Sequence, residues 1–208
     1  MELMIKAVFF DFDGVLALEP NGGNAISQAL ADKTGIAYDK LRPVYGKYAS
    51  QLVLEHKRYE TIIKLLNDEL KTQLTLDDLT EATHTSTHNR AMLDLAEELR
   101  AAGYITGIIT DNNVDRIDAL RELFGLDDFR PLIVSADVGH GKWQDSKIFE
   151  IAVDRASVQP QESLFIDNSK NNLAFAAKIG IQTYWHDDAT NDIAAFRIKL
   201  AKLGIKVQ

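Results

Sequence analysis

The sequence contains no cysteine and only four prolines in 208 residues. The lack of cysteine excludes disulfides, thiolate nucleophiles, thiolate zinc sites and iron–sulfur clusters. No run approaches the ~20 apolar residues that span a bilayer. Acidic residues outnumber basic ones by 31 to 23, which argues against a general nucleic-acid binder, because phosphate backbones attract excess Lys and Arg. We therefore expect neither a membrane nor a nucleic-acid partner. We read no signal peptide and expect a cytoplasmic location.

Apolar residues make up 46% of the chain. A chain of this length buries roughly 70% of its unfolded surface, so it needs no disulfide or zinc to fold. Short apolar runs predict five strands: Ile5–Phe10, Tyr104–Thr110, Pro131–Ser135, Ser163–Ile166 and Ile181–Trp185. The pattern is weakest for Pro131–Ser135. Most of these runs are nearly continuous, as in parallel strands that are buried on both faces.

Amphipathic helical patterns separate the last four strands. One such pattern covers residues 92–99, and Gly103 follows it as a natural C-cap. Strands that alternate with helices imply right-handed βαβ units. The sequence therefore predicts an α/β fold with a Rossmann-like parallel sheet.

More than ninety residues separate the first two strands, and they read almost wholly as helix. The candidate helices are Ala25–Lys33, Leu41–Glu55, Arg58–Lys71 and Leu76–Thr83. We interpret this segment as an inserted helical cap over residues 17–87, with a catalytic core formed by residues 1–16 and 88–208. Glu19–Gly23 is the expected hinge, and Thr83–Asn89 is the expected return to the core.

Polar residues follow the predicted strands, at the sheet edge where open α/β sheets bind ligands. The first strand ends in Asp11-Phe12-Asp13-Gly14, and the second ends in Thr110-Asp111-Asn112. Lys142 and Lys147 follow the third, and Asp167-Asn168 ends the fourth. Carboxylates packed this closely repel one another unless a cation offsets them. Oxygen ligands without cysteine suit a hard cation, most simply Mg²⁺.

Phosphoryl transfer uses these groups in separate roles. A strand-end carboxylate such as Asp11 can attack phosphorus, and Asp13, on the same face of an extended chain, can protonate the leaving oxygen and later activate water. A hydroxyl and a lysine can stabilise the non-bridging oxygens. Gly14 allows backbone amides to approach a phosphate closely.

Four segments resemble, in order, the motifs of the haloacid dehalogenase (HAD) superfamily. They are AVFFDFDGVLAL, YITGIITDN, GHGKWQDSKIFE and SLFIDNSKNNLAFAAKIGI, and the helical insertion resembles a C1-type cap. The resemblance covers almost the whole chain. It implies an Mg²⁺-dependent hydrolase that acts through an aspartyl-phosphate.

The resemblance also assigns roles to individual residues. Asp11 matches the nucleophile and Asp13 the general acid/base. Thr110 matches the hydroxyl that binds phosphate, and Lys142 matches the lysine that steadies the nucleophile and the phosphate. The expected Mg²⁺ ligands are Asp11, Asp13, Asp167 and Asn168, and the expected substrate-binding residues are Gly14, Asp111 and Asn112. Asp111, Asn112 and Asn113 also suit helix N-caps.

Two segments depart from the family pattern. The third motif lacks the prolines of close relatives and is longer, so Lys147 is a possible substitute for Lys142. In the fourth motif, Asn168 stands where relatives often have a second acid that ligates the metal. The site thereby loses a charge, which leaves two alternatives: metal affinity falls, or Asp167 takes the ligand role directly.

We therefore expect a phosphatase of small phosphate monoesters, with a small phosphorylated metabolite as substrate. A phosphomutase of the same superfamily and a non-catalytic module that binds a phosphate ligand or a protein stay open. Asp13 argues against dehalogenases and phosphonatases, whose motifs lack this acid. The sequence indicates neither the ester nor the oligomeric state.

Other polar clusters have ordinary explanations at this stage. His84 and His88 share a helix spacing but lack a third metal ligand. The segment 56–58 and the trio Arg42, Tyr45 and Lys47 could grip an anionic substrate from the cap, but solvated helix surface is the simpler interpretation.

Overall fold

The computed structural model describes residues 4–207 and contains one five-stranded parallel sheet in the order β3-β2-β1-β4-β5. This architecture confirms the predicted α/β fold, and each strand lies where an apolar run predicts it. The strands are β1 (Ala7–Phe10), β2 (Ile105–Thr110), β3 (Leu132–Val134), β4 (Ser163–Asp167) and β5 (Gln182–Trp185).

Strand β1 occupies the centre of the sheet. Its Ala7 pairs with Ile105 of β2 on one side and with Ser163 of β4 on the other. All four residues of β1 are fully buried, because helices cover both faces of a parallel sheet. The residues that follow β1 therefore emerge in the middle of the carboxyl edge.

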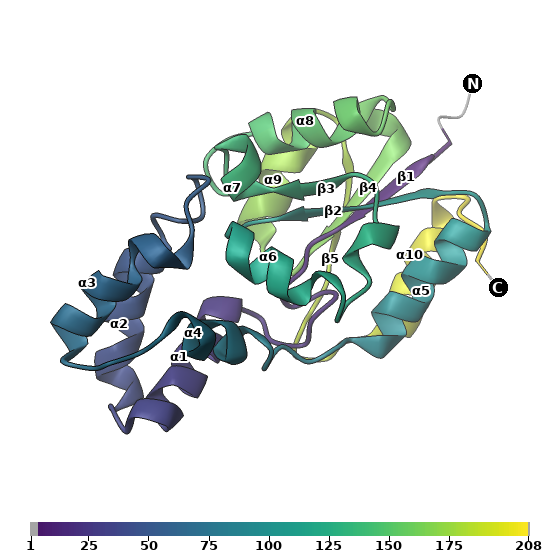
Figure 1. Ribbon diagram of the computed structural model, residues 1–208. Coiled ribbons are helices and arrows are strands. Elements are labelled where there is room, and N and C mark those ends of the chain that lie inside the picture. Colours follow the sequence, from purple (N-terminus) through teal and green to yellow (C-terminus); the bar gives the residue numbers. More distant parts are fainter. Residues whose placement is uncertain (1–3, 208) are drawn as a thin grey trace.

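Helices cover the two faces of the sheet (Figure 1). One face packs against α5 (Arg90–Ala101), α6 (Val114–Arg121) and α10 (Ile193–Lys202), and the other against α8 (Lys147–Arg155) and α9 (Lys170–Lys178). The short α7 (Ser135–Val138) follows β3. Within residues 4–207, no helix has the length and apolar content needed to cross a membrane.

The segment between β1 and α5 forms a separate group of helices beside the sheet (Figure 1). It contains α1 (Gly22–Thr34), α2 (Tyr38–Ala49), α3 (Ile63–Leu70) and α4 (Leu76–Thr83). These helices have an apolar cluster of their own, which includes Ile26, Leu41, Leu66 and Leu79. A separate core supports the cap proposed for residues 17–87.

Two helices of this group differ from the prediction. Helix α2 ends at Ala49, whereas the sequence pattern suggested Glu55; Leu52, which extended the apolar pattern, is fully buried but lies in a turn. The predicted helix 58–71 begins instead with a 3₁₀ turn at Tyr59–Thr61. Arg58 precedes that turn in an extended conformation, so the chain changes direction there.

The two connections to this group of helices run side by side. Ala17 and His88 form an isolated antiparallel bridge. The N–H of Leu18 donates to the carbonyl of Thr87, and the N–H of Asn89 donates to the carbonyl of Leu16, both at 2.9 Å. The chain therefore leaves the sheet and returns to it at nearly the same point, which supports the proposed cap boundaries.

Candidate active site

The carboxyl ends of β1, β2 and β4 bring polar side chains to one edge of the sheet. A cavity of about 190 Å³ opens there, and we call it the edge cavity. Its lining residues are Asp11, Asp13, Pro20, Asn21, Thr110, Asp111, Lys142, Asn168, Ser169 and Asn172. Segments far apart in the sequence thus meet at one small site, as the strand-end pattern predicted.

The ammonium group of Lys142 lies between two carboxylates. Its Nζ is 2.6 Å from Oδ1 of Asp11 and 2.8 Å from Oδ2 of Asp167. The side chain of Lys142 is only 2% exposed, whereas Lys147 is half exposed and pairs with Glu150. The geometry therefore favours Lys142 over Lys147 as the lysine of the site.

Asp167 lies beneath the edge cavity and is fully buried. Besides Lys142, it accepts hydrogen bonds from the backbone N–H of Ser169 at 2.6 Å and from the amide of Asn172 at 3.1 Å. Three donors therefore occupy its two oxygens, so Asp167 acts here as an anchor for Lys142.

Burial and neighbouring charge shift the ionisation of this group in opposite directions. Burial raises the pKa of Asp11, Asp167 raises it further, and Lys142 opposes both. Burial alone works to lower the pKa of Lys142, but the carboxylates of Asp11 and Asp167 outweigh it and raise that pKa. Lys142 consequently stays cationic, but its charge offsets only part of the effect of burial and of Asp167, and the pKa of Asp11 is raised.

Asp13 is held by an arginine that the sequence analysis did not single out. The terminal nitrogens of Arg116 donate to the two carboxylate oxygens of Asp13 at 2.7 and 2.8 Å. Arg116 lies in the first turn of α6, whose N-cap is Asn113. That cap is a sequence signal for a helix start near the sheet edge, but it does not indicate which side chains of the first turn face Asp13.

Asp13 also lines a second cavity of about 360 Å³, which we call the side chamber. The side chamber shares Asp13, Asn21 and Asp111 with the edge cavity. Asp11, in contrast, lines only the edge cavity and not the side chamber. The remaining lining residues of the side chamber are Gly22, Gly23, Ile26, Arg42, Tyr45, Gly46, Ala49, Ser50, Val53, Asn112, Asn113, Arg116 and Trp143. Asp13 therefore lies between two adjacent cavities.

The residues around Thr110 are held by hydrogen bonds within the protein. The amide of Asn112 donates to Oγ1 of Thr110 at 3.1 Å, and its carbonyl oxygen accepts from Arg116 at 3.0 Å. Asn112 lines the side chamber rather than the edge cavity. Oδ1 of Asp111 accepts the backbone N–H of Lys142 at 2.9 Å, and burial raises the pKa of Asp111.

Gly14 has a φ of +73° and lies against Asn168. A Cβ at this position would come within 2.2 Å of Nδ2 of Asn168. Gly14 does not itself line the edge cavity; it allows the side chain of Asn168 to reach its place there.

The predicted donors determine whether a magnesium ion would fit the edge cavity. No three Asp, Glu, His or Cys side chains in residues 4–207 form a cluster that could hold a metal. The carboxylate oxygens of Asp167 already accept from three donors, so they are not free to bind a metal ion. Asp11 and Asn168 do line the cavity, and Mg²⁺ needs only one or two protein oxygens because it keeps several waters and binds substrate phosphate. These hard oxygen donors fit such a loosely held ion.

The cap candidates divide into two groups. Arg42 and Tyr45 line the side chamber, whereas Lys47 pairs with Glu69 at 2.6 Å. Arg58 bonds Asp115 and Asp118 of α6 at 2.9 and 2.8 Å. The two hydrogen bonds from Arg58 therefore connect the segment before α3 to helix α6, which packs on the sheet.

The two histidines of the return segment have different surroundings, and neither belongs to a cluster of potential metal ligands among residues 4–207. The ring of His88 stacks on Phe124, with the ring centroids 4.1 Å apart, and its Nε2 lies 2.7 Å from the carbonyl oxygen of Leu123. His84 is exposed at the end of α4. The same segment contributes Ser86 to the surroundings of Arg116.

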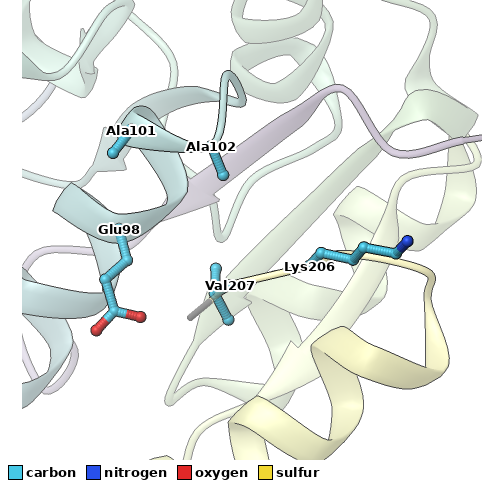
Figure 2. A pocket seen from close by; sticks show the side chains of 5 residues that line it. All are labelled: Glu98, Ala101, Ala102, Lys206 and Val207. Atoms are coloured by element: carbon cyan, nitrogen blue, oxygen red, sulfur yellow. The ribbon is translucent and has the colours of Figure 1, made fainter.

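A further cavity, of about 380 Å³, lies beside the end of α5 (Figure 2). Its lining residues are Glu98, Ala101, Ala102, Lys206 and Val207. Helix α5 ends just before β2 begins, so this cavity is at the amino edge of the sheet, opposite Asp11. The carboxylate of Glu98 is already paired with Arg197 at 2.6 Å. The cavity lacks the charge arrangement of the edge cavity.

Comparison with known proteins assigns this arrangement to a family. A model described as haloacid dehalogenase-like hydrolase matches residues 5–180. Glyceraldehyde 3-phosphate phosphatase of Pyrococcus furiosus is 26% identical over 201 residues, which cover 87% of this chain and 80% of that protein. (S)-2-haloacid dehalogenase 4A of Burkholderia cepacia is 32% identical over 87 residues, which cover 42% of this chain and 38% of that protein.

Solved structures share the fold. A HAD family enzyme from Bacteroides thetaiotaomicron, in complex with magnesium and inorganic phosphate, superimposes with a TM-score of 0.73 at 19% identity. The alignment covers 93% of this chain and all of that one. A HAD phosphatase from Thermococcus onnurineus superimposes with a TM-score of 0.61 at 25% identity, covering 88% of this chain and 85% of that one.

Proposed function

Because this chain belongs to the haloacid dehalogenase-like hydrolase family, we propose that it is a Mg²⁺-dependent phosphatase of small phosphate monoesters. The observation that carries this proposal is the place of Asp13 between the two cavities. The edge cavity offers Asp11, Thr110 and Lys142 to a phosphoryl group, and the side chamber offers room for the alcohol. The bridging ester oxygen then lies beside Asp13.

The first half of the reaction forms an aspartyl-phosphate. An oxygen of Asp11 attacks phosphorus, and the bond from phosphorus to the ester oxygen breaks. Asp13 gives its proton to the departing oxygen, so the alcohol leaves uncharged. Lys142 and Thr110 stabilise the negative charge on the non-bridging oxygens.

The second half returns the enzyme to its starting state. Asp13, now ionised, takes a proton from water as the water oxygen attacks phosphorus. The bond from Asp11 to phosphorus breaks, and inorganic phosphate leaves. The cap helices limit access of bulk water and of large esters, which favours small phosphorylated metabolites as substrates.

The residues that would hold Mg²⁺ are Asp11, Asn168 and the backbone carbonyl of Asp13. The bound ion would supply positive charge to the phosphoryl oxygens during transfer. Asp167 is unsuited to direct ligation, because its oxygens already serve Lys142, Ser169 and Asn172. Of the two alternatives that Asn168 raises, a weakly held ion is the one that these contacts favour.

The partial similarity to a haloacid dehalogenase makes dehalogenation the second candidate. A halide leaves as a stable anion and needs no proton, whereas an alkoxide needs an acid. Asp13 lies beside the proposed position of the leaving group, and Arg116 holds it there through two hydrogen bonds. This acid favours ester hydrolysis over dehalogenation.

The test measures phosphate release from a panel of small phosphate esters, with Mg²⁺ and with EDTA. We expect Mg²⁺-dependent turnover by the wild type, none by Asp11→Asn, and normal turnover by the control Asp154→Asn, which alters an exposed aspartate on α8. A chloropropionate arm tests dehalogenation. A folded wild type that hydrolyses no ester, or an Asp11→Asn variant that retains full turnover, overturns the proposal.

A further inference from the structure

Arg116 is the most deeply buried cation that lines the side chamber, and neighbouring groups pack closely around its guanidinium. Its side chain is 3% exposed. The guanidinium carbon lies 5.4 Å from the ring centre of Phe12, and on another side Gly22 approaches so closely that a Cβ there would come within 2.2 Å of it. This packing leaves the guanidinium little freedom.

Each terminal nitrogen of Arg116 donates twice. NH1 donates to Asp13 at 2.8 Å and to Asn112 at 3.0 Å. NH2 donates to Asp13 at 2.7 Å and to Ser86 at 3.1 Å. The backbone of Arg116 is held as well, since its N–H donates to Oδ1 of Asn113 at 2.9 Å. The fork of a guanidinium fits the two oxygens of one carboxylate, and an ammonium cannot reproduce that fit.

From this geometry we infer that Arg116 is a positioning residue, which fixes the carboxyl group of Asp13 between the edge cavity and the side chamber. The inference rests on the proposed phosphatase function. Arg116 does not touch the phosphoryl group in this scheme; it acts through Asp13. The contact with Ser86 also ties this position to the segment that returns from the cap.

The chemistry explains why such a clamp matters. When Asp13 carries the proton, one of its oxygens accepts from Arg116 while the other delivers that proton to the ester oxygen. When Asp13 is ionised, both oxygens accept from Arg116, as they do in this structure. A small displacement of a proton donor is costly, since transfer needs the donor within hydrogen-bond reach of the reacting atom.

A positioning role predicts a dependence on the leaving group that a merely structural role does not. Ethyl phosphate and acetyl phosphate are similar in size, but ethoxide needs a proton as it leaves and acetate does not. The ratio kcat/KM includes steps only up to release of that group. Hydrolysis of the aspartyl-phosphate, which both substrates share, therefore does not enter the comparison.

The experiment measures kcat/KM on both substrates for the wild type, Arg116→Gln, Arg116→Lys and Gly22→Ala. Gly22→Ala keeps the charge of Arg116 but displaces its guanidinium, because the new methyl group would come within 2.2 Å of Cζ. Arg197→Gln is the control, because it removes an arginine that donates to both carboxylate oxygens of Glu98, far from the two cavities. Thermal melting verifies that each variant is folded.

We expect Arg116→Gln to lower kcat/KM for ethyl phosphate about 100-fold and for acetyl phosphate about threefold or less. Arg116→Lys should show the same selectivity with smaller losses, Gly22→Ala should show the same selectivity, and Arg197→Gln should match the wild type. Equal losses on both substrates, or no loss, in a folded Arg116→Gln or Gly22→Ala variant overturn the inference. An inactive wild type overturns the phosphatase proposal and this inference with it.

Discussion

The Nζ of Lys142 lies 2.6 Å from Oδ1 of Asp11, in a site that is almost closed to solvent. The same ammonium group is 2.8 Å from Asp167. One cation therefore serves two buried carboxylates, one of which we propose as the nucleophile. Any change at Lys142 alters both the folded state and the chemistry.

Replacing Lys142 with Met should remove turnover and also destabilise the protein. The two carboxylates would stay buried without their shared counter-charge, and breaking a buried ion pair costs about 3–5 kcal/mol. Urea unfolding of the wild type and Lys142→Met measures this cost. Lys147→Met, at an exposed ion pair, is the control and should change stability little. An unchanged free energy of unfolding in Lys142→Met would contradict this account.

Asn168 offers a direct test of the metal site. Replacing Asn168 with Asp adds a charged oxygen next to the proposed ion, and affinity rises with ligand charge. We expect the Mg²⁺ concentration for half-maximal turnover to fall about tenfold. Oδ2 of Asp188 lies 3.4 Å from Nδ2 of Asn168, so a new carboxylate would be repelled there.

The double variant Asn168→Asp, Asp188→Asn removes this repulsion and should lower the Mg²⁺ requirement further. Asp188→Asn alone is the matched control. If titration with Mg²⁺ gives the same midpoint for all four proteins, residue 168 does not contact the ion.

Arg42 is expected to influence which esters react best. It lines the side chamber, and its Nε donates to the amide oxygen of Asn24 at 2.6 Å rather than to a carboxylate. Its positive charge is therefore available to an anionic leaving group. We expect the wild type to prefer phosphoglycolate to ethyl phosphate, and Arg42→Met to lose about tenfold of that preference through the lost charged hydrogen bonds.

The comparison requires kcat/KM for both esters. Lys47→Met is the control, because Lys47 belongs to the same helix but pairs with Glu69. Equal effects of Arg42→Met on the two substrates would show that Arg42 does not read the leaving group.

His186 should make stability depend on pH. It is 1% exposed, and burial lowers its pKa below the usual 6.5. The unfolded chain then binds a proton near pH 6.5 while the folded protein does not, so stability is fully present above that pH. It is lost as the pH falls from 6.5 through the lowered pKa.

Urea unfolding at pH 7.5 and at pH 5.5 tests this expectation. The wild type should lose more stability between the two conditions than His186→Gln, which keeps a polar group near Asn191, 3.1 Å from Nε2 of His186. His84→Gln changes an exposed histidine and should behave like the wild type. Identical losses in wild type and His186→Gln would rule out this role for His186.

Residues with local signals could be placed from the sequence. Asp11, Thr110 and Asp167 each end an apolar run, and parallel strands bring such ends to a common edge. Lys142 needed a motif in addition, because no strand end marks it. The structure places its ammonium group between Asp11 and Asp167.

Arg116 could not be placed in the same way. It is 103 residues from Asp13 in sequence, and its contact depends on how far α6 is rotated about its axis when it packs on its face of the sheet. No spacing rule encodes that rotation. The end of α2 was also misjudged, because the buried Leu52 fits a helical pattern equally well from a turn.

The paired connections at Ala17 and His88 join the helical segment to the sheet at one place. Two chain segments that already lie hydrogen-bonded side by side can be joined by a short turn at little entropic cost. None of the five strands of the sheet lies between these two connections. We therefore expect the proposed cap to be exchangeable as a unit, because its helices have an apolar cluster of their own and join the sheet at a single place.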